Sequence, residues 1–143
     1  MAAALAVLGG LGLPACTSPR NALGDATGRC YEALPVARAA LHGAGRFAGA
    51  RYLTVDALTR SLSEMHPRVV DVPARPASGR SAVCVVAYAG RFDASRVERG
   101  WAVDARTGRF ALVVVAAPSG RLLATLVLET VPLRFGGLFA IGQ

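Results

Sequence analysis

The stretch that decides the fold spans residues 110–116 and reads Phe-Ala-Leu-Val-Val-Val-Ala. It is rich in the β-branched residue Val and apolar on both alternating faces, which predicts a central strand of a sheet. Similar runs lie at residues 81–89, 101–105 and 122–131. The connections between the last three runs contain Thr107-Gly108 and Pro118-Ser119-Gly120, so we expect hairpins and antiparallel pairing.

The last of these runs alternates. Its apolar residues Leu122, Ala124, Leu126 and Leu128 share one face, and the other face carries Thr125 and Glu129. This period of two predicts a strand with one buried face and one solvated face.

Two helices are expected before the sheet. Residues 33–41 are rich in Ala and Leu, with Pro35 in the first turn and glycines just after the end. Residues 55–65 follow Thr54, a good N-cap, and stop before Pro67. The apolar positions of this second segment are Val55, Leu58, Leu62 and Met65, and their spacing predicts one helix face packed on a sheet.

The fold class that follows is α+β. Helical patterns come first and strand patterns afterwards, so we expect two short N-terminal helices packed on one face of a four-stranded or larger antiparallel sheet. The 143 residues, 53% of them hydrophobic, are enough for the core of one domain.

The net charge is +7, and all sixteen basic residues are Arg. They are scattered along the chain without a basic run, a distribution that argues against nucleic-acid binding. Attraction to an anionic lipid or polymer stays open as a general consequence of positive charge.

The N-terminus resembles the signal of bacterial lipoproteins. Residues 2–13 contain only Ala, Leu, Val and Gly, and Leu13-Pro14-Ala15-Cys16 is similar to their lipobox. The resemblance implies a signal peptide at 1–15, a lipidated Cys16 with a polar tether at 16–28, and a domain at 29–143. It also implies an exported protein, anchored to the membrane by lipid and facing the extracytoplasmic side. Plain secretion is the alternative, and an apolar segment without either role is another.

Cys30 and Cys84 then form an even pair, and oxidising compartments favour a disulfide between such cysteines. Two buried thiols are the alternative. We expect no metal, because no Cys-x-x-Cys occurs and neither His42 nor His66 lies beside a cysteine in sequence. No cofactor motif was found either: Gly43, Gly45 and Gly49 have the wrong spacing for a dinucleotide-binding loop.

One segment is a candidate binding loop. Acidic and basic residues alternate in it, namely Arg91, Asp93, Arg96, Glu98 and Arg99. Loops carried by a rigid sheet are where binding residues tend to lie, although ordinary solvation would produce the same mixture.

The sequence gives weaker evidence for a catalytic group than for a binding loop. Glu64 and His66 lie close together in sequence, with Asp71 nearby, and could act as an acid–base pair. A histidine before Pro67 more often ends a helix. Residues 101–110 are similar, over those ten positions, to the strand, turn and strand of PepSY-type envelope domains, and no function is transferred from that similarity.

Three functions remain from the sequence alone. The first is a non-catalytic, lipid-anchored envelope protein that binds a protein or a surface polymer. The second is an exported hydrolase with a dispersed site near His66. The third is a binder of nucleic acid or an anionic polymer through scattered Arg.

Overall fold

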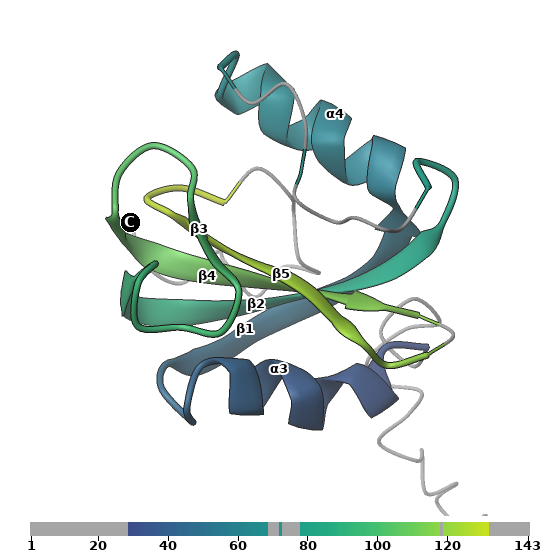
Figure 1. The fold of residues 1–143 in the computed structure, drawn as a ribbon, viewed down its shortest axis with the longest axis horizontal. Helices are drawn as coiled ribbons and strands as arrows, with labels where there is room; N and C mark the ends of the chain where they lie inside the picture. Colours follow the sequence, from purple (N-terminus) through teal and green to yellow (C-terminus); the bar gives the residue numbers. More distant parts are fainter. Residues whose placement is uncertain (1–28, 69–71, 73–77, 118, 132–143) are drawn as a thin grey trace, which may run out of the picture.

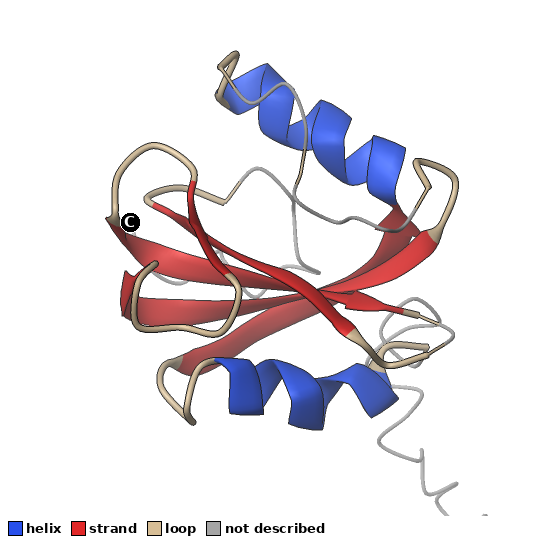
Figure 2. Ribbon diagram, viewed as in Figure 1, coloured by secondary structure: helices blue, strands red, loops and turns tan. Residues whose placement is uncertain are grey.

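The computed structural model describes residues 29–68, 72, 78–117 and 119–131. The expected signal peptide, Cys16 and the tether lie outside the described residues, as does Asp71. The described chain is an α+β domain in which a five-stranded sheet lies between two helices (Figures 1 and 2). Its elements are the 3-10 turn η1 (Tyr31–Ala33), α3 (Leu34–Ala40), β1 (Arg46–Thr54), α4 (Val55–Met65), β2 (Ala82–Asp93), β3 (Gly100–Ala102), β4 (Thr107–Ala116) and β5 (Leu122–Leu128).

The sheet has the order β1-β2-β4-β5-β3. The pairs β1–β2, β2–β4 and β4–β5 are antiparallel, as expected, and consecutive pairing of β4 with β5 agrees with the hairpin predicted between them. The short β3 instead pairs parallel to β5, so the sheet is mixed. The hairpin predicted at Thr107-Gly108 is therefore wrong: these two residues begin β4 and lie opposite Asp93 and Phe92 at the end of β2.

Strand β1 was not predicted from the sequence. Its nine residues include Gly49 and two exposed arginines, Arg46 and Arg51, and contain no β-branched residue before Thr54. Pairing with β2 along eight positions holds it in the sheet, and the register shifts between Phe47 and Gly49. Tertiary pairing thus overrides a weak local preference.

Both helices form where the sequence pattern placed them, but the expectation that they share one face is wrong. Figure 1 shows α4 on one side of the sheet and α3 on the other, with β1 between them in the chain. Alternate residues of β2 explain this arrangement. Val83 and Val85 pack in the core cluster under α4, while Cys84 and Val86 pack in the cluster under α3. A strand that is apolar on both faces needs a cover on both faces.

Helix α4 is anchored by local and core contacts. The Thr54 hydroxyl accepts a hydrogen bond from the Ala57 backbone N–H at 3.2 Å, which caps the helix as predicted. Leu58 and Leu62 are fully buried against the sheet. Met65 is 43% exposed, so the apolar stripe ends one turn earlier than expected.

Helix α3 is tied to the sheet by a disulfide. Cys30 and Cys84 are bonded, with their Cα atoms 5.4 Å apart, which confirms the predicted pair. Linking residues 54 positions apart stabilises the fold by about 4 kcal/mol in the chain-entropy treatment. The seven-residue helix buries Ala37 and Ala40, which is too little to hold it in place alone, so the disulfide secures this layer.

Strand β5 does not have the solvated face expected for it. Thr125 is completely buried, and its hydroxyl has no hydrogen-bond partner among the described residues. Its backbone N–H donates to Arg99 O at 2.9 Å. Val127, on the same face of β5 as Thr125, packs in the core cluster under α3, so this helix layer covers the face that the alternation had left to solvent.

Candidate functional site

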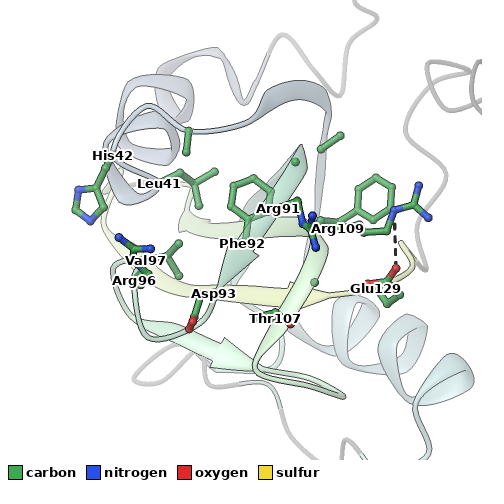
Figure 3. Close-up of a pocket in the computed structure, with 15 residues that line it drawn as sticks. Leu41, His42, Arg91, Phe92, Asp93, Arg96, Val97, Thr107, Arg109 and Glu129 are labelled. Carbon is green, nitrogen blue, oxygen red and sulfur yellow. Dashed lines mark ion pairs between the residues drawn. The ribbon is translucent and has the colours of Figure 1, made fainter.

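An open cavity of about 960 Å³ lies where the end of β2 meets the start of β4 (Figure 3). Its lining comes from the turn after α3 (Leu41, His42, Ala44), from residues 89–93 of β2, from Arg96 and Val97 of the following loop, from residues 107–110 of β4, and from Glu129. A cavity of this volume is at the upper end of the range for small-molecule sites.

The turn after α3 forms one wall. His42 and Gly43 have positive φ values of 52° and 76°, and the Gly43 N–H donates to Arg38 O at 2.9 Å, which closes the helix end. Gly45 then lies against Phe92: a Cβ built on this glycine would be 2.5 Å from the Phe92 ring. The close approach brings the turn over the end of β2.

The loop after β2 forms a second wall, and backbone hydrogen bonds fix it at several points. Ala94 N–H donates to Arg106 O at 2.8 Å, and Glu98 N–H donates to Ala40 O at the end of α3 at 2.9 Å. A Cβ on Gly100 would lie 1.8 Å from Ala94 O, so only glycine closes this loop. The loop is thereby held in one shape before any ligand binds.

Asp93 organises the start of that loop rather than facing a ligand freely. Its Oδ1 accepts hydrogen bonds from the Ser95 backbone N–H at 2.8 Å, from the Ser95 hydroxyl at 2.7 Å and from Arg106 Nε at 3.0 Å. The Ser95 bonds, followed by Arg106, lower the pKa of Asp93 to about 2. Its negative charge is thus present throughout the ordinary pH range.

Three arginines line the cavity, and their partners differ. Arg109 Nε lies 3.8 Å from Glu129 Oε1, a loose ion pair marked in Figure 3. Arg91 and Arg96 are exposed, and in the part of the chain that the structure describes neither side chain makes an ion pair or side-chain hydrogen bond. Among the described residues, no acidic side chain therefore pairs with the charges of Arg91 and Arg96 in this cavity.

Only part of the predicted binding loop lines the cavity. Arg91, Asp93 and Arg96 line the cavity, whereas Glu98 and Arg99 do not. The backbones of Glu98 and Arg99 instead tie the loop to α3 and β5.

Sequence reasoning missed the contributions of Leu41, His42, Arg109 and Glu129. The antiparallel register of β2 and β4 would have pointed to Arg109, because it brings residues 107–110 to the end of the sheet that holds Arg91.

His66 lies apart from this cavity, at the end of α4. Its Nδ1 is 2.7 Å from Asp104 Oδ1, and its buried Nε2 has no hydrogen-bond partner among the described residues. His66 thus pairs with Asp104, in the turn before β4. In the described chain His66 makes no ion pair or hydrogen bond with Glu64, the partner that the sequence suggested. Within the same ranges, no group of three or more His, Cys, Asp or Glu side chains is arranged to hold a metal ion.

Comparisons with protein-family models, with curated proteins and with solved structures gave no match to this chain. Among the described residues, no helix has the length and apolar character needed to cross a membrane. Function must therefore be argued from the chemistry of the cavity itself.

Proposed function

We propose that this protein is an exported, lipid-anchored binding protein without catalytic activity, and that it takes an anionic ligand in the cavity at the end of β2. The observation that carries the proposal is the presence of Arg91 and Arg96 in this cavity without a partner in the described chain. Arg is the side chain best suited to carboxylate and phosphate groups, because its planar guanidinium donates in parallel pairs.

The proposed compartment has separate support. A bonded Cys30 and Cys84 favour an oxidising environment, and they leave Cys16 as the third and unpaired cysteine of the chain. An unpaired cysteine after an apolar N-terminal segment fits the lipid attachment that the lipobox resemblance implies. The bound ligand would then be an anion of the cell envelope.

The hydrolase alternative finds little support around His66. The Asp104 carboxylate orients the imidazole, as an acid–base pair needs, but the other nitrogen is buried and meets no hydroxyl or thiol in the described chain. Catalysis requires the base to reach a substrate proton or a nucleophile. We therefore place function in the cavity.

The test is a binding titration with inorganic polyphosphate at several salt concentrations. The variant Arg91→Gln/Arg96→Gln removes the two cavity charges, and Arg80→Gln/Arg121→Gln removes two exposed arginines that do not line the cavity. Both double variants have the same net charge, so the non-specific attraction between the protein and polyphosphate falls equally in both. We expect the cavity double to lose about tenfold or more in affinity, as charged hydrogen bonds are worth about 1.5–3 kcal/mol each, and the control double to lose less than about twofold.

An equal loss in both doubles would contradict the proposal, because it would mean that the net charge alone attracts the anion. A DNA duplex that binds more tightly than polyphosphate and weakens equally in both doubles would favour the nucleic-acid alternative.

A further inference from the structure

We propose that the ligand of this cavity is an amphipathic organic anion, with an apolar group joined to a phosphate or carboxylate. The inference rests on the proposed function and extends it, because it assigns a chemical class to the ligand. Two kinds of surface, apolar and positively charged, meet in this cavity.

The base of the cavity is apolar. Phe92 and Leu41 are buried there, at 4% and 1% exposure. The partly exposed Val97 packs against the same core cluster, whereas Phe110 lines the cavity from the cluster on the other face of the sheet. A ligand that covers apolar surface in a cavity gains binding free energy in proportion to the area removed from water. An inorganic anion would leave this surface wet.

The charged groups flank that apolar base. Figure 3 shows Arg96 and His42 at one end, the Arg109–Glu129 pair at the other, and Arg91 beside Phe92 between them. A ligand lying on the base can therefore place its anionic group beside Arg91 or Arg96 without lifting its apolar part from the surface.

The two acidic residues of the cavity do not cancel this preference. The Asp93 carboxylate accepts hydrogen bonds from Ser95 and Arg106, and Glu129 forms an ion pair with Arg109. The charges that remain for a ligand are positive, so a neutral or cationic molecule with the same apolar group is disfavoured relative to the anion.

The walls are already ordered. The loop is joined through Glu98 N–H to Ala40 O and through Arg99 O to Thr125 N–H, both at 2.9 Å. A cavity that is shaped beforehand spends little binding free energy on ordering side chains and loops, so a small ligand can bind measurably.

The experiment compares the binding of three probes to the full chain with its disulfide intact: 2-naphthyl phosphate, 2-naphthol and inorganic phosphate. Affinities are measured by calorimetry, and amide chemical shifts locate the site. We expect 2-naphthyl phosphate to bind at least about tenfold more tightly than either of the other two, with shifts at residues 89–97.

Three variants separate the contribution of the arginine charges to binding from that of the apolar surface. Arg91→Gln and Arg96→Gln should each weaken 2-naphthyl phosphate by about five- to tenfold and leave 2-naphthol unchanged. Val97→Thr keeps the side-chain shape, adds a hydroxyl to the apolar surface, and should weaken 2-naphthyl phosphate while leaving phosphate unchanged. Arg121→Gln, in the turn between β4 and β5, is the matched control and should change nothing.

Equal binding of phosphate and 2-naphthyl phosphate, lost in the Arg variants, would overturn the amphipathic ligand and leave the anion-binding function standing. Equal binding of 2-naphthol and 2-naphthyl phosphate would show an apolar site and overturn both. Shifts that fall away from residues 89–97 would also overturn the inference.

Discussion

The imidazole Nδ1 of His66 lies 2.7 Å from a carboxylate oxygen of Asp104, and this contact joins the end of α4 to the turn between β3 and β4. The His66 side chain is only 10% exposed, whereas Asp104 is 44% exposed. One partner is thus nearly enclosed while the other remains in contact with water.

We predict that His66→Ala lowers the free energy of unfolding by about 1–3 kcal/mol, since it removes a packed side chain together with its hydrogen bond. Asp104→Ala should cost less, about 0.5–1 kcal/mol, because water screens the exposed carboxylate. Urea unfolding of both singles and the double gives the coupling free energy between them. Glu64→Ala is the control on the same helix end. Strictly additive single effects would contradict a direct interaction.

A second prediction concerns Asp93 and pH. Hydrogen bonds from Ser95, and then Arg106, lower the pKa of Asp93 in the folded state from its ordinary value of 3.8 to about 2. A carboxyl group whose pKa is lower in the folded state than in the unfolded state stabilises the fold at pH values above its unfolded-state pKa. This stabilisation is lost as the pH falls through the folded-state pKa. Asp93→Asn should therefore be less stable than the parent at neutral pH, and the two proteins should converge between pH 4 and pH 2.

Thermal unfolding of parent and variant across that range measures the convergence. Glu98→Gln serves as the control, because Glu98 is exposed and its side chain makes no ion pair within the described chain. A difference between parent and Asp93→Asn that stays constant down to pH 2 would rule out the carboxylate charge as its cause.

A third prediction tests the close approach of β4 and β5. A Cβ on Gly108 would lie 2.5 Å from the Leu128 backbone oxygen, and backbone cannot move aside as a flexible side chain can. Gly108→Ala should therefore destabilise the domain by about 2–3 kcal/mol or prevent folding. Gly120→Ala meets no atom within 4 Å and should cost about 1 kcal/mol, through its positive φ of 67° alone. Equal effects in chemical unfolding would contradict the packing argument.

The fourth prediction concerns export. Intact-mass measurement of protein from bacterial membranes should show loss of residues 1–15, added acyl mass at Cys16, and a two-hydrogen gain on reduction of Cys30–Cys84. Cys16→Ser should abolish the acyl mass and release the protein from the membrane fraction. An unprocessed chain with free thiols would overturn the proposed compartment. A cleaved chain without acyl mass would indicate plain secretion.

Much of the architecture follows from local patterns. Thr54, Leu58 and Leu62 suffice to predict α4, because a cap and a stripe with helical spacing are properties of neighbouring residues. The apolar run at residues 110–116 likewise predicts the central strand β4. The pairing of Cys30 with Cys84 follows from cysteine number and the inferred compartment.

The sequence by itself determined the α+β class, the positions of both helices and the apolar strands, because each depends on short-range periodicity; the structure then confirmed the disulfide, for which the sequence had left two free thiols as the alternative. Only the tertiary structure decided that β1 joins the sheet, that β3 runs parallel to β5, and that the helices cover opposite faces. It also brought Arg91, Arg96 and Arg109 around one cavity. The physical reason is that strand pairing and packing join residues far apart in the chain, and no local preference encodes which of them will meet.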